Sequence, residues 1–427
     1  MNKHPRAAQV LTGIFLLALA IRLGAIGIDW TRPLVGDEVA FDQIAWSVAS
    51  GHGYTRSSME GTRSPTAIRG PSYVLLLAAS YRLFGHNPTV PLVCQALLDA
   101  LSVLLVYWLG VRWFRYSGVG LVAAGLYAVF PPFISMSASL LNETFVQFTL
   151  LSAVALFFAH LDGRGTRYLL LSALALGLCA LSKPHVAAVG VLLGAAMVAR
   201  TGWARAVRAT AVMVAVVGLV MSPWVVRNSL VLGTFVPGLT WGGLGLWLGA
   251  GPVEGRTIGS LGERGVPDSL RRHVEALSEV ETDRWGVREA RRLIASDPGH
   301  YVLLSVKKVF RLWFNLGFDG VRPSRASLMV AAFNALAILL ALVGARLGRP
   351  DPASTWFMAM LAAYWTLVHV PFVAVVRYAF PYLAMLFVFA AAGVALLWWR
   401  SGSEAALAGL RTPGPGGGAG GRGKAAT

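Results

Sequence analysis

The chain has 427 residues, of which 56% are hydrophobic and only 13% are charged, whereas a soluble globular protein has about 25% charged residues. Lys and Arg number 37 against 20 Asp and Glu, which gives a formal net charge of +17. A basic nucleic-acid-binding protein presents its cations on a solvated face, and a chain this apolar cannot provide one. The composition therefore excludes a soluble enzyme, a disordered chain and a nucleic-acid partner, and it indicates a multi-pass membrane protein.

A membrane-spanning helix needs about 20 mostly apolar residues, and by that measure the sequence predicts an all-α bundle of about ten spans. The first is expected to be an uncleaved helix. With the N-terminus in the cytoplasm, the arginines of the short loops lie on the inner side, as the positive-inside rule requires. The sequence thus predicts a protein of a bacterial-type inner or cell membrane. The predicted spans are 10–28, 91–111, 117–136, 143–160, 167–182, 185–200, 208–226, 326–346, 354–372 and 379–399.

Two outer segments, 29–90 and 228–325, are too long to be plain connections. Within the first, Pro71–Gly85 is apolar but short for a span, so we expect it to lie in the membrane interface. The second has amphipathic patterns over Asp268–Ala295 and Tyr301–Leu316, which also predict interfacial helices. Residues 1–400 are therefore expected to form one transmembrane domain, followed by a disordered Gly- and Pro-rich cytoplasmic tail at 401–427.

The first outer segment begins with Gly36-Asp37-Glu38, which opens an amphipathic stretch soon after the first span. Acids in the first turn of a helix ordinarily satisfy free amides and the helix dipole, which is the structural interpretation. At the boundary between membrane and water, a carboxylate is also placed to act as general base on a hydroxyl acceptor. Arg69 follows in the same segment, and it either anchors to lipid phosphates or binds an anionic group bidentately.

Ionisable residues within spans are expensive and usually functional or paired. In the predicted topology all of those in this chain lie in the outer half, which favours a polar cavity open to the outside. For Arg22 and Asp99 the alternative is an ion pair that locks two helices. The residues concerned are Arg22, Asp99, Glu143, Lys183, Arg227 and Arg377.

Neither a cofactor nor a metal is predicted. No Gly-rich phosphate loop follows a predicted strand, and the histidines show no ligand spacing. The carboxylates of Asp37 and Glu38 would suit a hard divalent cation, but no further ligand pattern supports one.

Short motifs follow one another along nearly the whole chain: Gly36-Asp37-Glu38, Pro65-Thr66-Ala67, Arg69-Gly70-Pro71-Ser72-Tyr73, Leu83-Phe84-Gly85, Leu140-Leu141-Asn142-Glu143-Thr144, Ser222 to Asn228, Pro298 to Trp313 and Arg377 to Pro381. In this order and spacing they resemble family 39 of the C-type membrane glycosyltransferases. That family includes the dolichyl-phosphate-mannose-protein mannosyltransferases and the aminoarabinose transferases of lipid A. One departure is Arg69-Gly70-Pro71, where the family often has Lys-Pro-Pro. The cation is retained, but the Gly leaves the helix start less defined.

The resemblance implies a C-type bundle and a glycosyltransferase that takes a sugar from a polyprenyl-phosphate-linked donor at the periplasmic or exterior face. The sugar would pass with inversion to a hydroxyl on a lipid, glycan or protein. Asp37 falls where the family places its catalytic acidic residue, and Glu38 is its neighbour in the same motif. A phosphodiester-linked sugar needs a base for the acceptor and cations for the departing phosphate, but no general acid. The candidates for binding the phosphate or the substrate are Arg69, Tyr73, Glu143, Lys183, Arg227 and Arg377.

Two other functions fit the same composition. A secondary transporter or lipid flippase would also have many spans and buried charges, but transporters tend to show two similar halves, and no repeat is visible here. A polymerase or ligase of surface polysaccharide would share the outer-face site and use a different donor. The sugar and the acceptor stay open at this stage.

Overall fold

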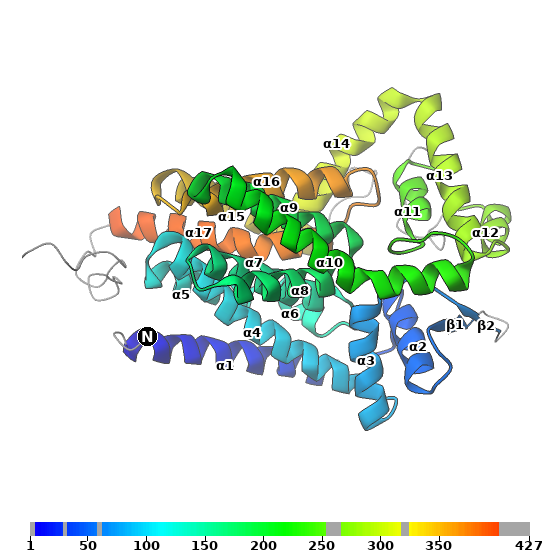
Figure 1. The fold of residues 1–427 in the computed structure, drawn as a ribbon, viewed down its shortest axis with the longest axis horizontal. Helices are drawn as coiled ribbons and strands as arrows, with labels where there is room; N and C mark the ends of the chain where they lie inside the picture. Colours follow the sequence, from blue (N-terminus) through cyan, green and yellow to red (C-terminus); the bar gives the residue numbers. More distant parts are fainter. Residues whose placement is uncertain (1–4, 29–31, 58–61, 253–265, 317–323, 401–427) are drawn as a thin grey trace, which may run out of the picture.

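The computed structural model describes residues 5–28, 32–57, 62–252, 266–316 and 324–400 (Figure 1). These residues are almost entirely helical. Their one sheet is the antiparallel pair β1 (Thr55–Ser57) and β2 (Arg63–Pro65). The predicted tail at 401–427 lies outside the described residues. The prediction of an all-α membrane bundle is confirmed.

Every predicted span falls on helical structure. Within the part of the chain that the structure describes, seven helical segments are long and apolar enough to cross a membrane, or eight if α5 and α6 form one bent span. This count is below the predicted ten. The apolar α8 is shorter, and α16 is not among the candidates. The bundle consists of α1 (Pro5–Ile28), α4 (Thr89–Phe114), α5 (Ser117–Val129), α6 (Pro131–Ser137), α7 (Glu143–Leu161), α8 (Thr166–Ser182), η1 (Pro184–Ala188), α9 (Val189–Thr201), α10 (Trp203–Leu232), α15 (Arg325–Leu347), α16 (Pro352–His369), η2 (Val376–Ala379) and α17 (Phe380–Arg400).

The predicted span at 117–136 is broken. Helices α5 and α6 meet at a bend of 59° around Phe130. Pro131 and Pro132 explain the break, because proline has no amide to donate and disfavours helical backbone in the residue before it. Phe130 accordingly has extended backbone angles.

The remaining helices gather at one end of the bundle, together with the β1–β2 pair (Figure 1). Helices α3 and α14 match the predicted amphipathic segments. The predicted helix at 268–295 is two helices, because Ser278 caps α13 through a capping box with Glu281. These outer helices are α2 (Asp37–Ala49), α3 (Pro71–Phe84), α11 (Gly242–Gly249), α12 (Asp268–Glu275), α13 (Glu279–Ser296) and α14 (Pro298–Phe314).

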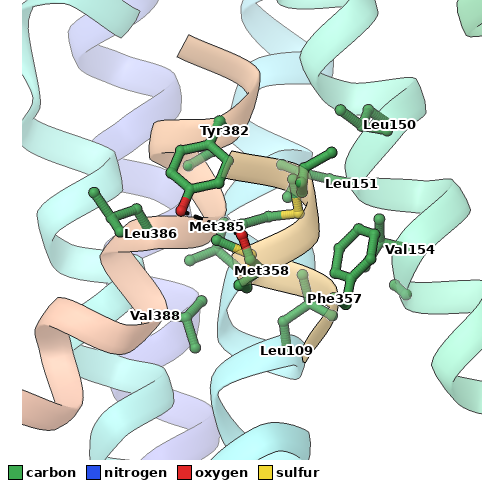
Figure 2. Packing of buried hydrophobic residues seen from close by; sticks show 14 of the residues in the cluster. Leu109, Leu150, Leu151, Val154, Phe357, Met358, Tyr382, Met385, Leu386 and Val388 are labelled. Carbon is green, nitrogen blue, oxygen red and sulfur yellow. Dashed lines mark hydrogen bonds between the residues drawn. The ribbon is translucent and has the colours of Figure 1, made fainter. Parts of the chain in front are cut away.

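The centre of the bundle is a dry apolar core. Figure 2 shows side chains of α4, α7, α16 and α17 interlocking, among them Leu109, Leu151, Phe357 and Met385. In the most apolar stretch of α7 and of α17, 78% of the residues are buried, against 17% for α1 and 22% for α10 and α15. Helices α7 and α17 therefore form the middle of the bundle, and α1, α10 and α15 present their leucines outward to lipid.

Arg22 and Asp99 form a buried ion pair. Of the two interpretations that the sequence left open for them, the structure has the ion pair and not the polar cavity. Arg22 Nε lies 2.5 Å from Asp99 Oδ2, and both side chains are almost fully buried. Arg22 also donates to the carbonyl of Ala128, and the hydroxyl of Tyr127 donates to Asp99. The pair thus ties α1 and α4 to α5, and it takes no part in the cavity described below.

We expect Asp99→Leu to destabilise the protein by about 3–5 kcal/mol, because the change leaves the guanidinium of Arg22 buried without its counter-ion. The thermal midpoint of the purified protein in detergent measures this effect. The double change Arg22→Leu with Asp99→Leu should recover much of the loss, since no unpaired charge remains. A double variant as unstable as the single one would contradict this account.

A second ion-pair cluster lies at the far end of the bundle from the outer helices. Arg112 bonds to Asp162 and Asp351, and Arg200 lies 3.4 Å and 3.2 Å from the same two carboxylates. Asp162 follows the last residue of α7, whereas Glu143 is its first. Along α7 the two positions are separated by about 28 Å at 1.5 Å per residue. Two arginines predicted to lie on the inner side therefore share one end of the bundle.

Candidate active site

At the outer end, five charged side chains from five different segments line one cavity of about 490 Å³, here called the cationic cavity. Three of the five are cations, and the rest of the wall combines aromatic residues with aliphatic and small ones. The charged residues are Asp37, Arg69, Glu143, Lys183 and Arg377, and the aromatic residues include Phe41, Trp241, Phe372 and Tyr378.

Asp37 lies between two guanidinium groups. Its Oδ1 accepts from Arg69 Nη2 at 2.5 Å, and its Oδ2 accepts from Arg377 Nη2 at 2.5 Å. Burial raises the pKa of Asp37, but the charges of Arg69 and Arg377 outweigh burial and hold the pKa below its usual 3.8. The carboxylate is ionised at neutral pH and remains one-third exposed. It is the more exposed of the two carboxylates that line this cavity, because the side chain of Glu143 is almost fully buried.

The sequence around Arg69 explains its position. Gly70 has extended backbone and Pro71 occupies the first turn of α3, which is the ordinary start of a helix. A Cβ at position 70 would collide with the backbone carbonyl of Leu181. The Gly that departs from the family pattern is therefore required here by close packing of the Arg69 loop on α8. Arg69 itself lies 5.3 Å from the ring centre of Phe41.

Lys183 and Arg377 reach the cavity from breaks between helices. Pro184 forces Lys183 out of helical conformation, so α8 ends at Ser182. Arg377 lies in the short helix η2 just before α17. Both approach Glu143 Oε1, at 3.4 Å for Lys183 Nζ and 3.6 Å for Arg377 Nε. Glu143 thereby links the two cations at the first turn of α7.

Glu38 has a different environment from its neighbour Asp37. It is 3% exposed and accepts from both terminal nitrogens of Arg32 and from the backbone amides of Val35 and Leu140. Burial raises the pKa of Glu38, and the bonds from Arg32 and the two amides lower it further than burial raises it. Because it accepts from all these donors, Glu38 joins the loop before α2 to the segment that leads into α7. Asp37 instead faces the cationic cavity.

A second cavity adjoins the first across Asp37 and Arg377, which line both. It has a volume of about 750 Å³ and is called the serine cavity after Ser135 and Ser139. Its other walls come from the end of α1, the loop before α2 and helix α6. Asp37 is thus reachable from two sides.

Two predicted substrate-binding residues lie outside the cationic cavity. Tyr73 is fully buried in the core between α2 and α3, and its hydroxyl donates to Gln95. Arg227 donates to the backbone carbonyls of Thr66 and Tyr54 at 2.7 Å and 2.8 Å. Arg227 therefore braces the loop that carries Arg69, and neither side chain lines the space where a donor would lie.

Glu279 is a residue that sequence reasoning did not single out. From the first turn of α13 it accepts from the hydroxyls of Thr66 and Thr240 and from the amide of Ala67. It joins the Arg69 loop to the segment that leads into Trp241, and so ties the two outer segments together. Thr66 lies 213 positions away in sequence, so no local pattern could have indicated this contact.

A third cavity, of about 830 Å³, is almost wholly apolar and lies among α14, α15, α16 and α17. Thr366 and Leu367 line this apolar cavity, and the next two residues of the chain, Val368 and His369, line the cationic cavity. Consecutive residues at the end of α16 therefore line the apolar cavity and the cationic cavity.

Among the described residues, no group of three or more His, Cys, Asp or Glu side chains is arranged to hold a metal ion. Both oxygens of Asp37 already accept from guanidinium groups, so a divalent cation would have to displace an arginine there. The expectation that the site works without a metal stays a prediction.

Comparison with known proteins gives a family match over part of the chain and a fold for nearly all of it. Residues 68–226 match the family model of the dolichyl-phosphate-mannose-protein mannosyltransferases. No curated protein sequence matches the chain significantly.

Among solved structures, the oligosaccharyltransferase of Archaeoglobus fulgidus tethered to an acceptor peptide is 15% identical with a TM-score of 0.59, covering 95% of this chain and 51% of that one. The oligosaccharyltransferase AglB of the same organism, in complex with an inhibitory peptide and a dolichol-phosphate, is 17% identical with a TM-score of 0.56. The match covers 92% of this chain and 50% of AglB. The chain thus spans about half the length of these proteins. ArnT from Cupriavidus metallidurans, bound to undecaprenyl phosphate, gives 14% identity, a TM-score of 0.44 and coverage of 90% and 79%.

The family match includes Arg69, Glu143 and Lys183 of the cationic cavity, and the shared fold extends over nearly all of this chain. The resemblance to family 39 is confirmed, and the chain has the fold of the C-type membrane glycosyltransferases.

Proposed function

We propose that this protein is an inverting glycosyltransferase that transfers a sugar from a polyprenyl-phosphate-linked donor to a hydroxyl acceptor at the extracytoplasmic face of the membrane. The observation that carries the proposal is the ionised carboxylate of Asp37 held between Arg69 and Arg377 in the cationic cavity. A base beside clustered cations is what this reaction requires, since a proton must be accepted and a phosphate must leave.

In this mechanism Asp37 takes the proton of the acceptor hydroxyl as its oxygen attacks the anomeric carbon of the donor sugar. The new glycosidic bond forms while the bond from the anomeric carbon to the phosphate oxygen breaks, so the configuration inverts in a single displacement. Polyprenyl phosphate leaves with the bonding electrons. Arg69, Lys183 and Arg377 stabilise the negative charge that develops on it.

The charges of the cavity suit a monophosphate donor. Three cations, Arg69, Lys183 and Arg377, face two carboxylates, Asp37 and Glu143, which leaves one net positive charge. A sugar–phosphate–lipid diester carries one negative charge, so its binding brings the site to neutrality. A diphosphate donor would exceed the available positive charge.

The neighbouring cavities suit the other parts of the substrates. The apolar cavity beside the cationic one offers a place for the first isoprene units of the donor lipid. The serine cavity reaches Asp37 from the other side, which suits the acceptor hydroxyl. AglB, whose fold this chain shares, has been captured with dolichol-phosphate, a lipid phosphate of the proposed kind.

The arginine-rich end of the bundle supports the proposed orientation. Arg112 and Arg200 lie at the end opposite to Asp37, and the positive-inside rule puts such an end in the cytoplasm. The cationic cavity would then face the periplasm or the exterior.

The test is a transfer assay with purified protein in detergent, where no ion gradient exists. Polyprenyl-monophosphate and polyprenyl-diphosphate donors carrying different single sugars are incubated with membrane lipid, glycan and peptide acceptors, and the free polyprenyl phosphate or diphosphate is measured. We expect wild-type protein to release polyprenyl phosphate from the monophosphate donors in an acceptor-dependent manner.

Two results would contradict the proposal. Release only from polyprenyl-diphosphate donors would indicate a polysaccharide polymerase or ligase. No release from any donor, together with movement of lipid-linked sugar across proteoliposomes, would indicate a transporter or flippase.

A further inference from the structure

Three buried polar atoms at the cationic cavity have no hydrogen-bond partner within the described part of the protein. Among the described residues, Arg69 Nε, Glu143 Oε2 and His185 Nε2 are buried and have no hydrogen-bond partner within the protein. All three residues line this cavity. Buried polar atoms are almost always paired in folded proteins, so unpaired ones need an explanation. A ligand that supplies hydroxyl groups at this wall would satisfy them.

The unpaired oxygen of Glu143 differs from the one that contacts the cations. Lys183 and Arg377 both approach Oε1, at 3.4 Å and 3.6 Å, and leave Oε2 without a donor. A carboxylate oxygen only accepts hydrogen bonds, so it repels a phosphate and attracts an O–H or N–H group. An ammonium is the less suitable partner, because two cations already lie beside this carboxylate.

His185 lies on the same wall and is held in place by its neighbours. Its backbone carbonyl accepts from the hydroxyl of Tyr364, and its ring packs edge-on to those of Trp365 and His369 at 5.7 Å and 4.9 Å. Its free Nε2 either donates or accepts according to the tautomer. A hydroxyl group does both, so a sugar hydroxyl pairs with either form.

Aromatic side chains form part of the remaining wall. Trp241, Phe372 and Tyr378 line the cavity together with the charged residues. Flat apolar side chains with a few fixed polar groups are typical of pockets that orient a small ligand. A volume of about 490 Å³ is toward the lower end for such pockets and suits one sugar ring with its phosphate better than an oligosaccharide.

We infer that Glu143 and His185 are specificity-determining residues that bind hydroxyl groups of a single neutral sugar ring on the donor, while Arg69, Lys183 and Arg377 bind its phosphate. The inference rests on the proposed function and adds the part of the cavity that selects the sugar. Glu143 serves the sugar through Oε2 and orients the two cations through Oε1.

The experiment measures kcat/KM for the best donor sugar and for its series of monodeoxy analogues, each as the polyprenyl monophosphate, with full-length protein. Wild type is compared with Glu143→Gln and His185→Phe. Glu289→Gln and His160→Phe serve as matched controls, since Glu289 pairs with Arg292 on α13 and His160 lies at the far end of α7. The ratio of parent to deoxy donor cancels effects that a variant has on both donors alike.

We expect wild type to prefer the parent over at least one deoxy donor by tenfold or more, because a site built to bind a hydroxyl is left with an unpaired group by the analogue. In Glu143→Gln or His185→Phe this ratio should fall at least fivefold for one hydroxyl position, and the control variants should keep it.

Three outcomes separate this inference from the proposed function. Wild-type transfer with unchanged ratios in both variants overturns the inference and leaves the function standing. A strong preference for an amino sugar that is lost in Glu143→Gln also overturns it, because the partner would be an ammonium. Absence of transfer from every monophosphate donor overturns both.

Discussion

Replacing Asp37 by Asn is expected to reduce kcat for sugar transfer by about 10²–10⁴-fold, the usual contribution of a general base. The amide keeps the size of the side chain but cannot take the acceptor proton. In wild type, Arg69 and Arg377 each donate to one carboxylate oxygen of Asp37. The amide nitrogen of Asn cannot accept from either guanidinium group, so one of these bonds is lost. The measurement is release of polyprenyl phosphate under saturating donor.

Asp42→Asn is the matched control. Asp42 lies in the same helix, and its Oδ1 accepts from the hydroxyl of Tyr81 and contacts His86, away from the cationic cavity. It should transfer sugar within about threefold of wild type, since Asn keeps an oxygen that can accept from Tyr81 and position 42 does not line the cationic cavity. If folded Asp37→Asn transfers sugar at the wild-type rate, Asp37 is not the base.

Arg377→Ala is expected to lower kcat/KM for the donor by about 10²–10³-fold, which is typical for loss of one group that stabilises transition-state charge. Arg377 contacts both carboxylates of the cavity, Asp37 and Glu143, so it is central to the charge balance. Arg63→Ala is the control, because Arg63 is exposed on β2 of the same outer segment. Equal kinetics for both variants, with donor near its KM, would remove Arg377 from the phosphate site.

The same variant should change the pH dependence. Burial raises the pKa of Asp37 and the two arginines lower it below 3.8, so wild type should show no acidic limb from this group between about pH 5 and 8. Removing Arg377 takes away one of the lowering charges, so the pKa of Asp37 rises. Less of the base is then ionised at a given low pH, and the rate should begin to fall at a higher pH than in wild type. Identical profiles would contradict this coupling.

The Asp37–Glu38 motif shows how far sequence reasoning reaches. Its place just after the first span indicated an acidic site at the membrane boundary, and Asp37 does line a charged cavity there. Sequence could not separate the two acids. Glu38 accepts from Arg32 and from the amide of Leu140, 102 positions away. That contact exists only because the segment between α6 and α7 packs beside α2.

The six ionisable residues singled out in the spans also show what the sequence could indicate and what only the fold decided. Sequence placed them all in the outer half of the bundle, which favoured one cavity, and left open an ion pair between Arg22 and Asp99. The fold puts Glu143, Lys183 and Arg377 there, uses Arg227 to brace the Arg69 loop, and joins Arg22 to Asp99 between helices. An ionisable residue within the membrane indicates only that it must have a polar or charged partner. Which partner it finds depends on how the helices pack.

Sequence by itself determined that this is a helical membrane protein, where most of its helices fall, that the arginines of the short loops share one end of the bundle, and which family its motifs resemble. Those properties follow from hydrophobic length, local backbone preference and composition, all of which are local along the chain. Tertiary structure alone decided which side chains form the site. Asp37 meets Arg69 across 32 residues and Arg377 across 340, and contacts at such separations are set by the packing of the bundle, not by any pattern near the residues themselves.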